Sequence, residues 1–406
     1  MNRSTATHIP LLLLLVLAGL SALAPLSIDM YLPALPTMAR DLGAQPAEGS
    51  LTVAAFFAGL CLGQLIHGPL SDRIGRRIPL LAGIAVYVIA SAGAALSNSV
   101  EMLIAARLLQ ALGGCAGLVV SRALVRDRFP PQESAHVFSM LLLVMSLAPI
   151  LAPLLGSWVL LVASWRALFW ILTGFGILLA LACFFRLEET RSAETAAHAR
   201  SESPFAAYRI LLTERSVMAY ALTAGLAHMG LLTYLATSPD VLVTAFHLSP
   251  QTYGWVIAIN GTGLITTNYL NRRLLAHFSY DRILRGATLG SLLASTVLLI
   301  DAATGFGGLW GITTPLFFMV AMIGFTQPNA LAGAMAQDIH RAGSISALVG
   351  FLQFGAGALG ATIAGWLHDG TALPMAGVIF TAYVLAVLAL RLLGPQAAPA
   401  GAEFPR

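Results

Sequence analysis

Long apolar runs separated by short polar loops make up most of the chain. A helix that crosses a membrane needs about 20 predominantly apolar residues, and about twelve stretches reach that length. Their approximate ranges are 9–31, 50–69, 78–97, 100–121, 136–160, 165–185, 217–238, 252–271, 283–303, 309–331, 343–367 and 371–393. The pattern predicts an all-α membrane protein with about twelve transmembrane helices.

One long polar stretch interrupts this pattern between the sixth and seventh apolar runs. It covers residues 187–215 and carries both acidic and basic side chains. We therefore expect two six-helix halves, residues 1–186 and 216–406, joined by a linker over residues 187–215. The first apolar run imitates a secretory signal, but it continues through Pro25 to Leu35, which favours an uncleaved transmembrane helix.

Composition supports a membrane protein. The 406 residues are 58% hydrophobic and only 10% charged, whereas a soluble domain carries about 25% charge. The net charge of +4 does not indicate nucleic-acid binding, because the arginines lie in scattered short loops. The three cysteines lie in separate apolar runs without metal-ligand spacing, so we expect packing roles and neither a metal nor a cofactor.

The arginines are distributed unequally between the two sets of loops. Loops on the cytoplasmic side of membrane proteins are enriched in Lys and Arg. The opposite set carries only Arg40 and Arg166. We therefore predict that both termini and the linker are cytoplasmic. The Arg-rich set contains Arg73, Arg76, Arg77, Arg122, Arg126, Arg128, Arg272, Arg273, Arg282, Arg285 and Arg341.

Two charges lie inside apolar runs. Asp29 is the only charged residue between Arg3 and Arg40, and Arg107 lies within the fourth predicted helix. Such charges are costly in a membrane unless they face a partner or a polar cavity, so Arg107 needs a carboxylate or a set of carbonyls. Alternatively, Asp29 ends its helix near the headgroups, or caps a following helix.

The depths of these two charges match. Asp29 precedes Leu35 by six residues and Arg107 follows Glu101 by six, which places each about 9 Å from the same boundary. We therefore expect an ion pair, in which Arg107 favours the ionised form of Asp29 and burial favours the neutral form. This balance would suit a proton-coupling site. Pro33 and Pro36 leave open a helix end close to Asp29, in water.

The loop after the second predicted helix reads from Gly68 to Arg77 as GPLSDRIGRR, and it resembles the signature loop of the major facilitator superfamily. The loop after the eighth predicted helix is a weaker basic counterpart. The resemblance implies two six-helix bundles and a cytoplasmic latch, in which we expect Asp72 to pair with Arg122 or Arg126, or to lie near the start of the eleventh helix. Alternatively, the loop arginines only fix topology. The expected latch residues are Gly68, Asp72, Arg73, Gly75, Arg76, Arg122 and Arg126.

Two further helices carry resemblances. Residues 103–110, with Arg107 and Gln110, resemble the fourth-helix motif of this superfamily. Residues 148–156, with Pro149, Pro153 and Gly156, resemble the fifth-helix motif of its antiporters, although alanine replaces the usual glycine at 148 and 152. Alternatively, this helix is simply a kinked packing helix.

The sub-family is indicated by the stretch DMYLPALP, which begins at Asp29 and resembles the first-helix signature of Bcr/CflA drug-resistance transporters. Residues 121–127, 164–170 and 327–353 agree with it. The resemblance implies a monomeric exporter in the bacterial inner membrane that exchanges small compounds such as bicyclomycin or chloramphenicol for protons. It also implies that Asp29 is the proton and substrate site and that Arg107 is its partner.

The remaining polar and aromatic residues in the predicted helices are candidates for substrate contact, because a drug site is mostly apolar with a few polar anchors. For each aromatic, and for His228, simple packing is an alternative. A metabolite exporter or a proton symporter is also possible. The chain has no HExxH, GxSxG or Walker sequence, which argues against an enzyme; a channel or receptor is a further alternative. The candidates are Tyr31, Phe56, Gln110, His228, Asn260, Gln327 and Phe351, then Phe57, Tyr234, Asn329, Gln353 and Phe354.

Overall fold

The computed structural model describes residues 11–129, 131–191, 204–338 and 341–394, and over these ranges the chain is helical with no strand. The predicted all-α class is confirmed. The first half contains α1 (Leu11–Asp29), η1 (Leu32–Ala34), α2 (Leu35–Asp41), α3 (Pro46–Ile74), α4 (Arg77–Ala95), α5 (Val100–Arg128), α6 (Pro131–Val162) and α7 (Trp165–Arg186). The second half contains α9 (Pro204–Thr213), α10 (Arg215–Pro239), η2 (Asp240–Ala245), α11 (Pro250–Leu274), α12 (Tyr280–Thr304), α13 (Gly308–Gln337), α14 (Ala342–Trp366) and α15 (Leu373–Leu392).

Ten helices in the described ranges are long and apolar enough to cross a membrane, and α6 and α11 are the other long helices. Several extend beyond the apolar run that predicted them. The helix predicted over 50–69 starts at Pro46 and ends at Ile74. Helix α5 ends at Arg128. Backbone hydrogen bonding continues into the polar boundary, so apolar length alone underestimates these helices.

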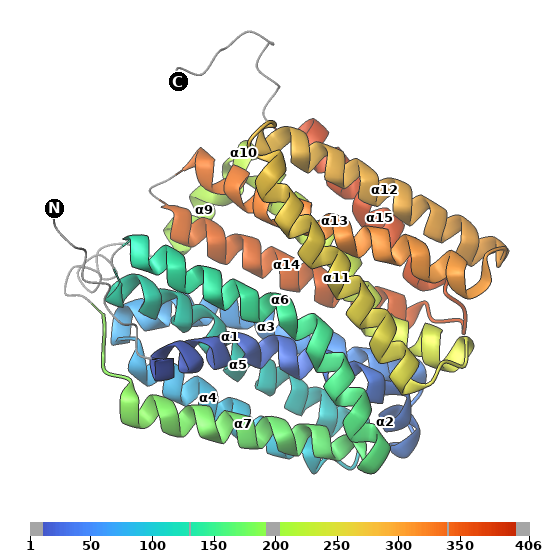
Figure 1. The fold of residues 1–406 in the computed structure, drawn as a ribbon, viewed down its shortest axis with the longest axis horizontal. Helices are drawn as coiled ribbons and strands as arrows, with labels where there is room; N and C mark the ends of the chain where they lie inside the picture. Colours follow the sequence, from blue (N-terminus) through green and yellow to red (C-terminus); the bar gives the residue numbers. More distant parts are fainter. Residues whose placement is uncertain (1–10, 130, 192–203, 339–340, 395–406) are drawn as a thin grey trace, which may run out of the picture.

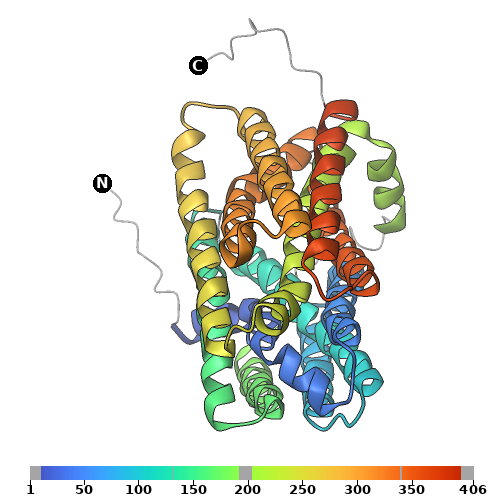
Figure 2. The same ribbon diagram turned by 90° about the vertical axis from the view of Figure 1, so that its right-hand side faces the viewer.

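The two halves lie side by side as two helical bundles (Figure 1). Figure 2 shows the same two bundles after a turn of 90° about the vertical axis. Two helix pairs dominate the boundary between them, α3 with α14 and α6 with α11. The helices approach closely there because one partner presents glycine: a Cβ on Gly254 would lie 3.0 Å from Ser157 Oγ, and one on Gly261 would lie 2.9 Å from Ile150 Cγ1.

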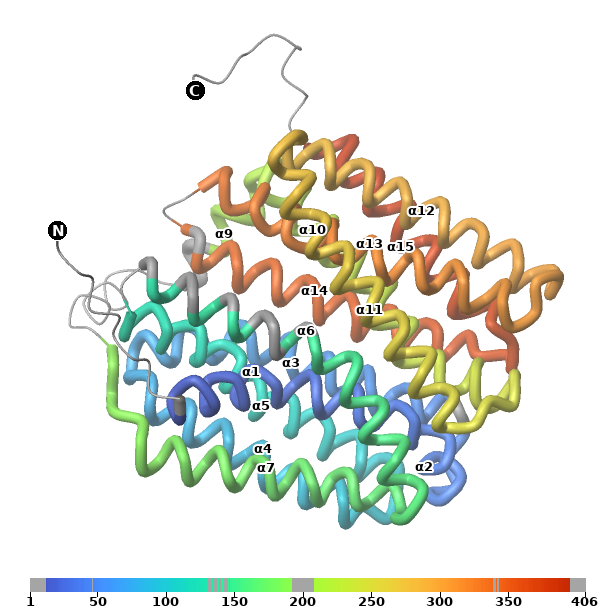
Figure 3. Tube along the Cα trace, viewed as in Figure 1, coloured from blue at the N-terminus to red at the C-terminus, as the bar shows by residue number. Residues whose placement is uncertain are grey.

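The two ends of the molecule differ. Helix α9 and the start of α1 lie at one end, with residues 68–77, and we call this the basic end because the arginine-rich loops gather there. Helix α2 and η2 lie at the other, which we call the opposite end (Figure 3). Helix α9, η1, α2 and η2 are short elements that the apolar pattern did not predict.

The first helix is broken at the opposite end. Pro25 lies inside α1, and Asp29 is its last residue. Pro33 lies in the short turn η1 that follows, and Pro36 lies in the first turn of α2. Proline cannot donate a backbone hydrogen bond, which explains why the chain leaves α1 and restarts as α2. Asp29 is therefore a helix-end residue, yet it is only 5% exposed.

Candidate functional site

Arg107 is buried in the middle of the first bundle, with no exposed surface. Helix α5 carries it, and its Nη1 donates hydrogen bonds to the backbone oxygen of Ser27 at 3.0 Å and to Oε1 of Gln110 at 2.6 Å. Gln110 follows three residues later and lies on nearly the same helical face. The expectation that Arg107 needs carbonyl-type acceptors or a carboxylate is thus met by two carbonyl oxygens.

Aromatic rings complete the surroundings of this guanidinium. Its central carbon lies 4.1 Å from the ring centre of Phe56, 4.7 Å from that of Tyr31 and 5.7 Å from that of Phe169. A desolvated cation over an aromatic face gains about 2 kcal/mol. Nε and Nη2 of Arg107 make no hydrogen bond to any described residue. The aromatic rings therefore stabilise the buried charge of Arg107 where two of its three guanidinium nitrogens have no hydrogen-bond acceptor within the described chain.

The expected ion pair between Asp29 and Arg107 is wrong for this conformation. Among the described residues, the ion pairs include neither side chain. Arg107 points toward Phe56, inside its own bundle. On the side of the other bundle, Tyr253 lies within electrostatic range of the Asp29 carboxyl. Arg107 reaches the backbone of α1 two residues before Asp29, but position along a helix does not determine which way a side chain points around it.

Asp29 lies where three helices meet. A Cβ on Gly156 of α6 would lie 3.0 Å from the Cα of Met30, so α6 packs directly against the turn that follows Asp29. Tyr253 of α11 approaches from the second bundle and is fully buried. Over the described chain, only Asp29 and Asp301 are buried acidic side chains. The alternative that Asp29 lies in water at a helix end is therefore wrong.

Several predicted substrate contacts are enclosed in the protein. Tyr31, Phe56 and Gln110 surround Arg107 and are 1%, 0% and 0% exposed. Asn260 is 4% exposed and donates a hydrogen bond to the hydroxyl of Tyr234 at 2.7 Å. In this conformation these four candidates contact other buried side chains and have almost no solvent-exposed surface.

Polar residues behind Arg107 link three further helices to it. Nε2 of Gln110 donates to Oγ of Ser91 at 2.8 Å. The hydroxyls of Ser27 and Tyr87 lie 2.8 Å apart and share a hydrogen bond. The hydroxyl of Tyr31 similarly bonds that of Thr52, at 2.8 Å. Small hydroxyl residues in apolar runs are common, so sequence alone gave no reason to select these partners.

Four predicted residues come together in the second bundle. Nε2 of Gln327, on α13, donates to the carbonyl of Ala224 at 3.1 Å and to Nδ1 of His228 on α10. Gln353 on α14 donates to Oε1 of Gln327. The edge of the Phe354 ring meets the imidazole, with centroids 6.2 Å apart. All four side chains are half-buried.

The imidazole of His228 has a defined role in this arrangement. Gln327 uses both amide hydrogens as donors, so Nδ1 of His228 is an acceptor and the ring is neutral. Nε2 of His228 makes no hydrogen bond to the described residues and is free to donate one. Phe351, also half-buried, lies on the same helix as Gln353, and its carbonyl accepts a bond from the thiol of Cys61 at 3.4 Å.

The loop at residues 68–77 is built around Arg76. Its side chain is buried and donates to Asp72, to Oγ of Ser71 at 3.0 Å and to Oδ2 of Asp127 at 2.8 Å. Burial opposes its charge, but the hydrogen bonds that Arg76 donates to Asp127 and Asp72 outweigh burial and raise the pKa of Arg76. A guanidinium held between two carboxylates stabilises both of them in one geometry.

The expectation that Asp72 pairs with Arg122 or Arg126 is therefore wrong. Arg122 and Arg126 are exposed and form no ion pair with any residue the structure describes. Arg76 lies four residues after Asp72, beyond the end of α3, and forms the ion pair with Asp72 instead. Arg76 is among the latch residues expected from the sequence, but the partner of Asp72 was expected on a neighbouring helix end.

A linker residue holds the same loop. The carboxylate of Glu189 accepts the backbone N–H of Arg76 at 2.8 Å and that of Arg77 at 3.1 Å, at the start of α4. Burial raises its pKa, but the bonds from these amides and those of Arg191 and Thr190 outweigh burial and lower the pKa. Gly75 has φ +105°, and a Cβ there would lie 2.9 Å from the Glu189 carboxyl carbon, so glycine is required. No pattern in residues 187–215 distinguished Glu189 from the other linker acids.

The other latch candidates lie nearby with fewer contacts. Arg73 is exposed, and its carbonyl accepts a bond from Arg191, whose Nη1 also reaches the carbonyl of Asp72 at 3.3 Å. Gly68 has open space where a Cβ would project. Residues 68–77 are thus held by their own Arg76 and by the first residues of the linker.

The fifth-helix motif lies at the boundary between the bundles. Pro149 and Pro153 are inside α6, and the carbonyl of Pro153 would lie 3.2 Å from a Cβ on Gly254 of α11. Nε2 of Gln251 donates to the carbonyl of Ser157 at 3.2 Å. Together with Gly156, this motif joins the turn after Asp29 to the second bundle.

Comparisons with known proteins agree with this architecture. Residues 17–361 match the family model described as Major Facilitator Superfamily. The chain is 36% identical over 93% of its length to an uncharacterized MFS-type transporter, YdgK, of Bacillus subtilis, covering 94% of that protein. It is 29% identical to a bicyclomycin resistance protein homolog of Haemophilus influenzae, covering 97% of this chain and 98% of the other. It is also 29% identical to the multidrug resistance protein MdtL of Escherichia coli, over 93% and 94% of the two chains.

Solved structures share the fold at low sequence identity. A D-xylose-proton symporter superposes with a TM-score of 0.75, at 15% identity, over 95% of this chain and 98% of the other. A partially occluded inward open xylose transporter, XylE of E. coli, gives a TM-score of 0.72 with the same identity and coverage. At this identity the likeness concerns the fold alone.

Proposed function

Because the chain belongs to the major facilitator superfamily, and is thus a multi-pass membrane transporter rather than an enzyme, we propose that it exports small drug-like molecules in exchange for protons. Two relatives that match over nearly the whole chain are named for bicyclomycin or multidrug resistance. Those names support antibiotic-like compounds, of the bicyclomycin or chloramphenicol kind, as the substrate class.

The observation that carries the proton part is the position of Asp29. It is buried at the boundary between the bundles, near Tyr253 of the other bundle, and it pairs with no cation among the described residues. A buried carboxyl without a cation is far less costly in its neutral, protonated form. We propose that Asp29 holds its proton while the opposite end is closed and releases it when the boundary opens.

The close packing at the opposite end provides the coupling. In transporters of this kind, the two halves rock around a central site and expose it to each side in turn. Opening the opposite end would separate Asp29 from Tyr253 and admit water to the carboxyl. Arg107, held by three rings and two carbonyl oxygens, would keep the turn after α1 in place through its bond to the Ser27 carbonyl.

The substrate part rests on the half-buried cluster of His228, Gln327, Gln353 and Phe354, with Phe351 nearby. Neutral amide and imidazole groups beside aromatic rings suit a ligand with polar groups on an apolar frame. By the arginine distribution, the basic end and both termini are proposed to face the cytoplasm of a bacterial inner membrane. The chain is proposed to act as a monomer.

Reconstitution into liposomes tests the proposal. With an imposed pH gradient, wild-type protein should move chloramphenicol or bicyclomycin against its concentration gradient, and a protonophore should abolish this movement. Asp29→Asn should lose uphill transport but retain downhill exchange, because the site remains but carries no proton. Asp301→Asn, which removes the other buried carboxyl, is the matched control and should keep uphill transport.

Three outcomes would contradict the proposal. Uphill transport by Asp29→Asn at the wild-type rate would exclude Asp29 as the proton carrier. Movement of substrate in the same direction as protons would instead establish a symporter, and failure with these drugs but success with a metabolite would establish a metabolite exporter.

A further inference from the structure

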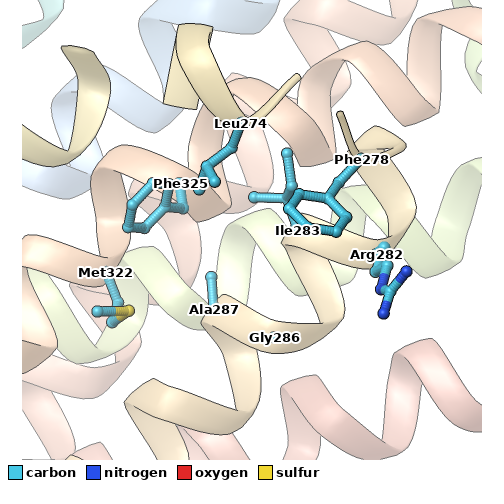
Figure 4. A pocket seen from close by; sticks show the side chains of 8 residues that line it. All are labelled: Leu274, Phe278, Arg282, Ile283, Gly286, Ala287, Met322 and Phe325. Carbon is cyan, nitrogen blue, oxygen red and sulfur yellow. The ribbon is translucent and has the colours of Figure 1, made fainter. Parts of the chain in front are cut away.

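A groove opens on the side of the second bundle, at the basic end (Figure 4). It has a volume of about 350 Å³ and lies between the end of α11 and the start of α12, over α13. These first two helices both pack on α13, which forms the floor. The lining consists of Leu274, Phe278, Arg282, Ile283, Gly286, Ala287, Met322 and Phe325.

Arg282 is the one charged side chain among these lining residues, and it projects from the edge of the apolar cluster (Figure 4). Its guanidinium carbon lies 5.0 Å from the ring centre of Phe278. The neighbouring acid, Asp281, accepts a hydrogen bond from the hydroxyl of Tyr220 at 2.6 Å and is therefore occupied elsewhere. Arg282 is exposed and forms no ion pair within the described residues.

The surroundings of the groove are basic. Residues 271–285 carry four arginines and one aspartate, which gives a charge of 4 − 1 = +3. Arg273 packs over the ring of Tyr269 with its guanidinium carbon 5.0 Å from the ring centre, which holds a second cation near the same boundary. Basic pockets between transmembrane helices bind anionic lipid headgroups, and each nearby cation adds about fivefold in affinity.

We propose that this groove binds one acyl chain of an anionic phospholipid and that Arg282 binds its phosphate. The apolar floor suits an acyl chain, and the exposed guanidinium at the edge suits a phosphate that remains at the membrane surface. The site is separate from the boundary between the bundles, so it does not depend on the transported substrate.

A second lateral groove provides an internal comparison. It has a volume of about 420 Å³, lies at the opposite end between α10, α14 and α15, and is also mainly apolar. Its only charged lining residue is Asp369. Hydrogen bonds from Thr371 lower the pKa of that carboxyl and keep it ionised. A negative charge at the edge repels an anionic headgroup, so this groove is not expected to select one.

The test is a lipid titration of the purified full-length chain, freed of lipid in detergent and followed by native mass spectrometry. Phosphatidylglycerol and phosphatidylcholine with the same acyl chains are the two probes. Wild-type protein should bind one phosphatidylglycerol at least about fivefold more tightly than phosphatidylcholine. Arg282→Gln should remove this preference, and Arg282→Lys should restore most of it.

A second variant tests the acyl part of the site. Gly286 has open space where a Cβ would project, so Gly286→Leu fills the groove without a clash and should weaken binding of both lipids. Gly377→Leu makes the same change in the groove with Asp369, where a Cβ is also unobstructed, and should leave phosphatidylglycerol binding unchanged. Arg391→Gln removes an exposed cation elsewhere at the basic end and serves as the charge control.

The proposal is overturned if the two lipids bind wild-type protein equally. It is also overturned if Arg282→Gln and Arg391→Gln reduce phosphatidylglycerol binding to the same extent, since that would indicate general surface charge. Unchanged binding by Gly286→Leu would exclude the groove as the acyl site.

Discussion

Substituting Phe56 by leucine tests whether the rings around Arg107 stabilise its buried charge. Phe56 is the nearest of the three rings, with its centre 4.1 Å from the guanidinium carbon. Phe57 is the next residue on α3, is equally buried, and makes no such contact with a cation among the described residues. Phe57→Leu therefore loses a similar apolar area and provides a matched control.

The expected magnitude follows from this comparison. Both substitutions lose apolar burial and create similar cavities, and these costs largely cancel in the difference. The remaining difference is the cation–π contact, about 2 kcal/mol for a desolvated guanidinium. Phe56→Leu should therefore have a free energy of unfolding lower than that of Phe57→Leu by about 1–2 kcal/mol, a factor of about 5 to 30 in the folded-to-unfolded ratio.

Denaturant unfolding of the purified protein in detergent measures this difference. The comparison is repeated in an Arg107→Met background, which forms a double-mutant cycle. If the guanidinium causes the difference, it should disappear in that background. Equal destabilisation by Phe56→Leu and Phe57→Leu in otherwise wild-type protein would refute the reasoning, and so would a difference that persists without Arg107.

Two further predictions concern the ends of the molecule. Glu189→Gln should destabilise the start of α4 by about 1 kcal/mol or less, because the carboxylate is largely solvated. The pKa of Glu189 is lowered in the folded protein, so the wild-type protein should lose this stabilisation as the pH falls below about 4.5, while the variant should show no such pH dependence. Hydrogen exchange at the backbone amides of Arg76 and Arg77, whose hydrogen bonds the carboxylate accepts, measures both effects. Gly156→Val should abolish uphill transport in liposomes while the protein still folds, because the valine side chain would collide with the Met30 backbone. The control Gly174→Val places its side chain in open space and should transport normally. Normal transport by Gly156→Val would show that the close contact between α6 and Met30 is not needed.

The apolar pattern predicted the helices well because membrane burial requires an apolar surface over a fixed length, whichever way each side chain faces. The same pattern correctly indicated that Arg107 needs acceptors. It could not indicate that the acceptors are the Ser27 carbonyl and Gln110, because a backbone carbonyl has no sequence signature.

The errors in the candidate site have a common cause. From the sequence, Asp29 and Arg107 are compared by position along their helices, but the rotation of each helix about its own axis directs them to different neighbours. That rotation is set by tertiary packing, such as the approach of Gly156 to Met30. The contact between Glu189 and the start of α4 joins residues 113 apart along the chain, and no local pattern encodes a contact of that range.

The two bundles contribute differently to the boundary between them: the second half provides glycines, and the first half provides the groups that pack against them. Within the described chain, the glycines that approach the other bundle belong to the second half: Gly254 and Gly261 on α11, and Gly350, Gly355 and Gly365 on α14. The first half supplies the side chains and carbonyls that fill these hollows, including Ile150, Cys61 and Gln64. Chimeras between related transporters should therefore assemble whenever the second half keeps these boundary glycines. A larger side chain in place of one of these glycines cannot be accommodated by making other residues of the second half smaller. Compensating changes for such bulk should be found in the first half, and a suppressor screen would locate them on α3 and α6.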